Sequence, residues 1–264
     1  MDLGLTGKTV FISGSTAGIG YATALQFVKE GALVVVNGRN EARVSKAVAS
    51  LKSEVPSANV RGVAADISSA PGIQKIAAAV PAVDVLVNNA GIFEPKSFER
   101  ISDPEWIRFF ETNVMSGVRL SRQYLPGMLK KNWGRILFIS SESAIQIPVE
   151  MIHYGVTKTA QLALARGLAE STRGTGVTVN SILPGPTRSE GVAEFVASLA
   201  KQKGIGLAQM EKEFFATARP SNLLERFATP SEVANLVVYA ASAAASATNG
   251  SSLRVDGGTI RSIA

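Results

Sequence analysis

The sequence predicts an α/β protein built on a parallel sheet of about seven strands, with helices on both faces. Short apolar segments rich in Val and Ile alternate along the 264-residue chain with segments whose apolar residues recur at helical spacing. The expected strands are apolar on both faces, which is typical of a parallel sheet covered by helices on its two sides. The length would suit one large domain or two small ones, but no linker interrupts the alternation. We therefore expect residues 1–264 to form one doubly wound domain.

The strand segments are recognised by their β-branched and aromatic residues. They are expected at 8–13, 32–40, 59–66, 83–91, 134–141, 176–183 and 251–258. Helices are expected between them, where apolar residues recur three or four positions apart. The first follows Gly20 and stops at Gly31, and the second follows the capping residue Asn40 and ends before Pro56. A short helix is expected at 71–80.

Two later helices are marked by capping boxes, at Ser102–Glu105 and Thr229–Glu232. The first of these should open a long helix that contains Asn113. Segment 188–225 departs from the regular alternation of strands and helices, and its pattern predicts amphipathic helix. Its large apolar residues at helical spacing are Phe195, Leu199, Leu207, Met210, Phe214 and Phe215.

Three glycines, Gly14, Gly18 and Gly20, follow the first expected strand. A glycine turn between a strand and a helix is the context that a dinucleotide-binding loop requires, although the spacing here is G-x-x-x-G-x-G. Glycine permits the tight turn and lets a pyrophosphate approach backbone N–H groups at the helix start. The alternative, an ordinary turn between strand and helix, is disfavoured by three glycines within seven residues.

The second expected strand runs into Asn37, Gly38 and Arg39, with no acidic residue before Glu41. At this position an acidic residue would bind the ribose 2′-hydroxyl of NAD, whereas an arginine meets the 2′-phosphate of NADP. Arg39 therefore favours NADP, and the alternative is an arginine that is only solvated.

Tyr154 and Lys158 lie four positions apart in a segment with helical spacing that should run to about Arg173. Such positions share a helix face, so the phenol and the ammonium can project into one cleft. A nearby ammonium favours the phenolate, and we expect it to lower the pKa of Tyr154 by roughly 1–3 units. Ser141 ends the preceding strand, and its hydroxyl could hold one oxygen atom together with the phenol. Taken alone, the pair would also fit an ordinary amphipathic helix.

Composition excludes several kinds of site. The chain has no cysteine, and its single histidine, His153, excludes a multi-histidine metal centre and a serine–histidine triad elsewhere. The net charge of +6 is scattered, which argues against nucleic-acid binding and favours nucleotide phosphates or an acidic carrier. No signal peptide is visible, and no run reaches the roughly 18 apolar residues of a membrane span. We expect a soluble cytoplasmic protein with no metal and no membrane partner.

Six features stand in an order and spacing that resemble the short-chain dehydrogenase/reductase family of NAD(P)-dependent oxidoreductases. They are SGSTAGIG at 13–20, NNAG at 88–91, Asn113, Ser141, YGVTK at 154–158 and PGPT at 184–187. The resemblance covers essentially the whole chain and implies a Rossmann-type fold. It further implies a substrate lid over 188–225 and a homotetramer.

The resemblance implies that Tyr154 is the general acid in carbonyl reduction and the general base in alcohol oxidation. Lys158 would lower the pKa of that tyrosine and bind the nicotinamide ribose. Ser141 would polarise the carbonyl, and Asn113 would hold a water that relays protons to the lysine. The cofactor-binding residues implied are Gly14, Ser15, Thr16, Gly18, Ile19, Gly20, Arg39, Asp66, Ile67, Asn89, Ala90, Tyr154, Lys158, Pro184, Gly185 and Thr187.

We therefore expect an NADPH-dependent reductase of a small carbonyl substrate, with a free ketone and an acyl thioester as the open choices. The main alternative is a 3-oxoacyl-carrier-protein reductase. The alternative of another class is a non-catalytic NADP-binding scaffold, which the presence of all four catalytic positions disfavours. His153 is expected at the surface or the cleft wall, without a catalytic part. Glu142 is expected in solvent, and the alternative is that it touches the substrate.

Overall fold

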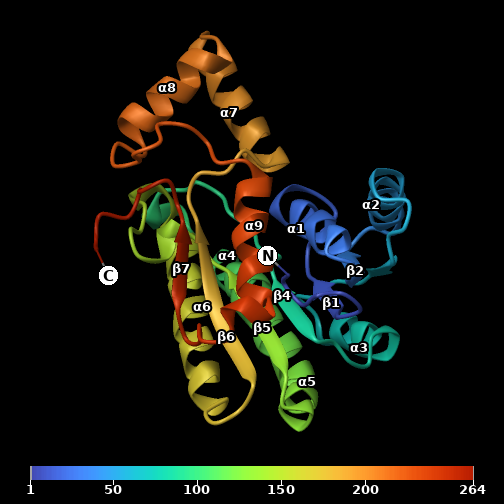
Figure 1. The fold of residues 1–264 in the computed structure, drawn as a ribbon. Helices are drawn as coiled ribbons and strands as arrows, with labels where there is room; N and C mark the ends of the chain where they lie inside the picture. Colours follow the sequence, from blue (N-terminus) through green and yellow to red (C-terminus); the bar gives the residue numbers. More distant parts are fainter. Residues whose placement is uncertain (1, 264) are drawn as a thin grey trace.

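Seven parallel strands form the centre of the computed structural model, which describes residues 2–263 (Figure 1). The strands are β1 Thr9–Ile12, β2 Leu33–Gly38, β3 Val60–Ala64, β4 Val85–Asn88, β5 Gly134–Ile139, β6 Val177–Pro184 and β7 Ser252–Val255. Their spatial order is β3-β2-β1-β4-β5-β6-β7, and every pairing is parallel. The predicted α/β class and the seven strands are confirmed.

Helices cover both faces of this sheet, and two more project from it. The helices are α1 Gly18–Lys29, α2 Glu41–Glu54, α3 Ala70–Ala79, α4 Asp103–Phe110, α5 Ser116–Lys131, α6 Ile152–Ser171, α7 Glu190–Lys203, α8 Leu207–Thr217 and α9 Pro230–Ala241. The predicted caps are present: the Asn40 side chain accepts from the Arg43 N–H, and both capping boxes form at Ser102 and Thr229. One face of the sheet packs against α1, α2 and α9, and the other against α3, α5 and α6.

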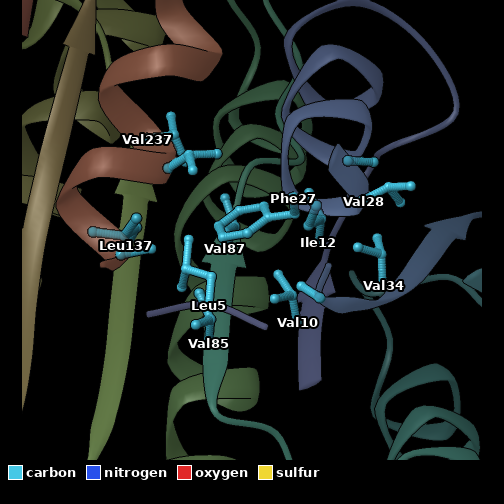
Figure 2. Packing of buried hydrophobic residues seen from close by; sticks show 14 of the residues in the cluster. Leu5, Val10, Ile12, Phe27, Val28, Val34, Val85, Val87, Leu137 and Val237 are labelled. Carbon is cyan, nitrogen blue, oxygen red and sulfur yellow. The ribbon is translucent and has the colours of Figure 1, made fainter. Parts of the chain in front are cut away.

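The apolar residues of each strand alternate between these two layers. In β1, Val10 and Ile12 join the cluster under α1 and α9, whereas Phe11 joins the cluster under α3 and α5. Figure 2 shows the first cluster, in which Phe27 of α1 lies over Val87 of β4. Burying a Val, Ile or Phe side chain contributes about 1.5–3 kcal/mol, so apolar burial on both faces holds the central strands in register.

The direction in which the chain crosses the sheet reverses between β1 and β4. From β1 the chain proceeds outward to β2 and β3, and then returns to place β4 on the opposite side of β1. In open parallel sheets, a ligand binds outside the carboxyl ends of the strands at such a switch point. The loops that follow β1 and β4 are therefore where a site is expected.

The long helix predicted after Ser102 is interrupted once. Helix α4 ends at Phe110, a π-helical turn spans Glu111–Met115, and α5 continues to Lys131. Asn113 lies in this wider turn, where its side chain is hydrogen-bonded to Ile92 and Thr157. Turns of this kind are frequent at functional sites, and helical periodicity does not reveal them.

Helices α7 and α8 form a hairpin that projects from the sheet, beyond the start of α9 (Figure 1). This hairpin has an apolar cluster of its own, formed by Val196, Ala200, Met210, Phe215 and Phe227. Within residues 2–263, no helix combines the length and the apolar character needed to cross a bilayer.

Candidate active site

The loop between β1 and α1 lies against the end of β4. Gly14 and Gly18 have positive φ values of 61° and 57°, which favour glycine. A Cβ on Gly14 would lie 2.9 Å from the Cα of Ala90, so the close approach of the two loops also requires glycine. The amide of Asn89 holds the loop by donating to the carbonyls of Ser13 and Gly14, each at 2.9 Å.

Helix α1 begins beside this loop without a side-chain cap at Ala17. Its first N–H groups therefore remain available, and the partial positive charge of the helix start favours an anion. Gly20 contributes indirectly: a Cβ there would lie 2.5 Å from Nδ2 of Asn89, so this glycine allows the helix to pack against the β4 loop.

Ser15 is engaged by its own protein neighbours. Its side chain is buried, its hydroxyl donates to the Ile12 carbonyl at 2.7 Å, and the same oxygen accepts from the Asn37 N–H. Its own N–H donates to the Asn37 carbonyl. The bonds to Asn37 join the end of β1 to β2, and a contact of Ser15 with the cofactor stays a prediction.

A cavity of about 430 Å³ opens beside the glycine loop, and we call it the nucleotide cavity. The predicted cofactor residues that line it are Gly14, Thr16, Arg39, Asp66, Ile67, Asn89 and Ala90. Arg43 and Arg108 also line it. Arg39 precedes α2, Arg43 lies in its first turn, and Arg43 forms an ion pair with Glu190 at 3.2 Å. Both arginine side chains that follow β2 are exposed, and together with the uncapped helix they fit a phosphorylated dinucleotide.

A second cavity of about 360 Å³ lies on the other side of the loop, and we call it the substrate cavity. The predicted residues that line it are Ile19, Ser141, Tyr154, Pro184, Gly185 and Thr187. Of the six large apolar residues named for segment 188–225, Phe195, Leu199 and Phe214 line it as well. Met210 and Phe215 pack inside the hairpin, and Leu207 is exposed.

Lys158 lies behind Tyr154, as the helical spacing predicts. Its Nζ is 5.5 Å from the centroid of the phenol ring, and it donates to the Ile139 carbonyl at 2.8 Å. Burial of the ammonium lowers the pKa of Lys158 to about 7.

The prediction that Tyr154 has a lowered pKa is wrong for this structure. Burial raises the pKa of Tyr154, and the carboxylate of Glu142 raises it further, because both disfavour the phenolate. The Ser141 hydroxyl and the guanidinium of Arg219 act in the opposite direction and are outweighed. Spacing along a helix reveals Lys158 but not the buried carboxylate.

Asn113 is linked to Lys158 through a glutamine. The Oδ1 of Asn113 accepts from the Ile92 N–H at 2.8 Å, and its Nδ2 donates to the Ile92 carbonyl at 3.0 Å. The backbone oxygen of Asn113 accepts from Nε2 of Gln161 at 2.5 Å, and Oε1 of Gln161 accepts from Lys158 at 3.4 Å. The glutamine was not among the predicted residues, although it lies three positions after Lys158 and that spacing could have revealed it. The water held by Asn113 stays a prediction.

Glu142 is buried, in contrast to the predicted solvated carboxylate. It accepts from the Ser141 hydroxyl at 2.5 Å and from Nε of Arg219 at 3.0 Å. Arg219 follows the α7–α8 hairpin, is itself buried, and also donates to Glu150 at 3.2 Å. No sequence signal distinguishes Arg219 from the other arginines of the chain, because its partner lies 77 positions away.

His153 lies in the core, not at the surface or the cleft wall as predicted. Its ring centroid is 3.9 Å from that of Phe109 and 6.0 Å from that of Trp106. Burial lowers the pKa of His153, so the ring is neutral at pH 7.

Comparison with known proteins agrees with this arrangement. The family model described as short chain dehydrogenase matches residues 8–200. The chain is 48% identical over 267 residues to the uncharacterized oxidoreductase YvrD of Bacillus subtilis (strain 168), with 100% of each chain covered. It is 31% identical over 262 residues to the 3-oxoacyl-[acyl-carrier-protein] reductase FabG of Aquifex aeolicus (strain VF5), with 98% and 99% covered.

Among solved structures, the chain is similar to L-sorbose reductase from Gluconobacter frateurii, determined in complex with NADPH and L-sorbose. The TM-score is 0.92, the sequence identity is 32%, and 100% of each chain is covered. The likeness extends over the whole chain in both sequence and structure. It follows that this protein is a member of the short-chain dehydrogenase/reductase family of oxidoreductases.

Proposed function

We propose that the protein interconverts a ketone and an alcohol with NADPH, and that Tyr154 is the proton donor in the direction of reduction. The observation that carries this proposal is that Tyr154 and Ser141 line one cavity together with Pro184, Gly185 and Thr187. That cavity adjoins the loop whose glycines fit a dinucleotide. The cofactor, when bound, supplies the hydride.

Tyr154 is protonated at neutral pH, since burial and Glu142 both disfavour the phenolate, and it therefore has a proton to donate as negative charge develops on a carbonyl oxygen. The raised pKa makes the phenol a weak acid, so the donation depends on the hydrogen bonds and the cation around it. Ser141 adds a second hydrogen bond when its proton turns from Glu142 to the same oxygen. Lys158, with a pKa of about 7, is suited to return a proton to the phenolate, and Gln161 and Asn113 hold it in place. Alcohol oxidation needs the phenolate, so these surroundings favour reduction at neutral pH.

NADP is the proposed cofactor because Arg39 and Arg43 line the nucleotide cavity where a 2′-phosphate would lie. The carboxylate of Asp66 lines the same cavity, but it accepts hydrogen bonds from the N–H and the hydroxyl of Ser68. It is therefore engaged within its own loop. The NADPH bound by the sorbose reductase supports the same choice. The α7–α8 hairpin is the proposed substrate lid, since three of its apolar side chains line the substrate cavity. The homotetramer and the cytoplasmic location stay predictions.

A 3-oxoacyl thioester of a carrier protein is the second candidate substrate, favoured by the 31% identity to FabG and by the net charge of +6. The non-catalytic scaffold is disfavoured, because Tyr154 and Ser141 share a cavity and Lys158 and Asn113 are joined through Gln161. Oxidation of NADPH should be followed with neutral ketones and with a short acetoacetyl thioester, which separates the two substrate classes.

Tyr154→Phe is the decisive variant for this function. Removing the phenol proton should reduce turnover by about 10²–10⁴-fold, the usual contribution of a general acid, while NADPH affinity stays nearly intact. Turnover is measured by NADPH oxidation, and affinity by titration of cofactor fluorescence. Unchanged turnover would remove Tyr154 as the proton donor. A wild-type protein that binds NADPH but reduces no carbonyl of either class would support the scaffold.

A further inference from the structure

The substrate cavity has a charge pattern that the proposed reaction does not use. Its walls are mostly apolar, with large contributions from Phe93, Phe195, Leu199, Phe214 and Phe227. Among the residues that the structure describes, three charged ones line it: Glu142, Glu150 and Arg219. We call these three the charged wall.

The charged wall contains two carboxylates and one guanidinium. Nε of Arg219 donates to Glu142 at 3.0 Å, and Nη1 donates to Glu150 at 3.2 Å and to the Ala218 carbonyl at 2.7 Å. The Arg219 and Glu142 side chains are 9% and 6% exposed, so this pair is shielded from water. One positive charge is therefore shared by two negative charges, which leaves the wall with a net charge of −1.

Among the described residues that line the cavity, no second cation offsets this charge. Three cations lie near it outside the lining, and each is engaged elsewhere: Lys158 donates to the Ile139 carbonyl, Arg188 over the Phe227 ring pairs with Glu211, and Lys96 pairs with Glu105. A charge that enters an apolar cavity loses its hydration and is accepted only where an opposite charge can replace it. Within the described residues that line this cavity, the one cation is already paired.

We propose that the charged wall makes the enzyme selective for an uncharged ketone with an apolar body, and that it excludes substrates that carry a carboxylate. This inference rests on the proposed function for the reaction itself. A neutral substrate fills the apolar walls at no electrostatic cost. A carboxylate would add a third negative charge beside Arg219.

The competing interpretation is that Arg219 anchors an acidic substrate. For that, the guanidinium would have to leave Glu142, and a buried carboxylate would lose its counter-ion. Removing one partner of a buried ion pair is strongly unfavourable, so the anchor would work against the contacts that hold it in place.

The kinetic test compares ethyl acetoacetate with acetoacetate, which differ in charge next to the same ketone. The Glu150 side chain is 43% exposed, so its charge is partly screened by water. We still expect kcat/KM to be at least about tenfold higher for the ester, because a partly screened charge a few ångströms away provides about that factor. Glu150→Gln removes the excess negative charge, and this preference should fall by about tenfold. Glu194→Gln removes an exposed carboxylate of α7 outside the cavity, and it should leave the preference unchanged.

A binding test separates this inference from the proposed reaction. Titration calorimetry of the NADPH complex with benzamide and with benzoate compares two ligands of similar shape that differ in charge. Tighter binding of the amide, with a gain for benzoate in Glu150→Gln, supports the inference even if no ketone is reduced. Equal or tighter binding of benzoate, or no binding of either ligand, overturns it, as does a preference for acetoacetate over its ester.

Discussion

The nucleotide half of the site and its substrate half are built by different means. In the nucleotide half, at the ends of β1, β2 and β4, the important groups are backbone atoms, glycines and the two arginines that follow β2. In the substrate half, the important groups are side chains that pair across long separations, such as Arg219 with Glu142, 77 positions apart. The first half follows from local sequence, whereas the second depends on how the α7–α8 hairpin lies over the sheet.

This difference teaches which features a single sequence can specify. A glycine with positive φ is required by the local backbone, so it can be recognised from the sequence of the loop alone. A buried ion pair is a property of two segments together, and neither segment alone contains a sign of it. We therefore expect substitutions in the nucleotide half to change cofactor binding, and substitutions in the substrate half to change pH dependence and selectivity.

Among the substitutions that test this comparison, the largest effect on cofactor binding is expected for Gly14→Ala. The positive φ and a Cβ 2.9 Å from the backbone of Ala90 would force the loop away from β4. A strained backbone of this kind costs about 1–3 kcal/mol, and NADPH affinity should fall by about 100-fold, measured by fluorescence titration. Gly127→Ala in α5 is the matched control, because a Cβ there meets nothing within 4 Å. The same loss in both variants would contradict the steric argument.

An intermediate effect is expected for Arg39→Ala. A lost charge-assisted hydrogen bond to the 2′-phosphate should weaken NADPH binding by about tenfold and leave NADH binding unchanged. Dissociation constants for both cofactors, with the exposed Arg173→Ala as control, would show the difference. Equal weakening of the two cofactors would mean that Arg39 does not bind the phosphate.

The smallest effect at neutral pH is expected for Glu142→Gln. Reduction needs the protonated phenol, so its rate falls as pH rises through the pKa of Tyr154. The carboxylate raises that pKa, so its removal should move the fall to lower pH. Because the variant also takes a buried counter-ion from Arg219, thermal unfolding must show that the variant is folded at each pH at which the rates are compared. Oxidation, which needs the phenolate, should begin at a correspondingly lower pH. Profiles of kcat against pH that coincide with the wild type would contradict the influence of Glu142.

Most of the fold could be predicted from the sequence. The apolar residues of the helices and strands recur with clear periodicity, and several helices begin at capping residues that can be recognised from a few neighbouring positions. The site was predicted as a set of positions more completely than as a set of interactions. Ser15 stands within the glycine motif, yet it joins two strands, because its small hydroxyl fits between them. His153 stands beside Tyr154, yet it points into the core, because neighbouring positions on a helix face different directions. The burial of Glu142 and the bridging amide of Gln161 depend on contacts that only the folded chain provides.

The buried pairing of Arg219 with Glu142 has a consequence for exchanging parts between relatives. An engineer who grafts a foreign hairpin together with the turn that follows α8 would import or remove the guanidinium without its matching carboxylate. Such chimeras should express poorly, or their activity should depend abnormally on pH, until the arginine and its carboxylate partner are transferred together.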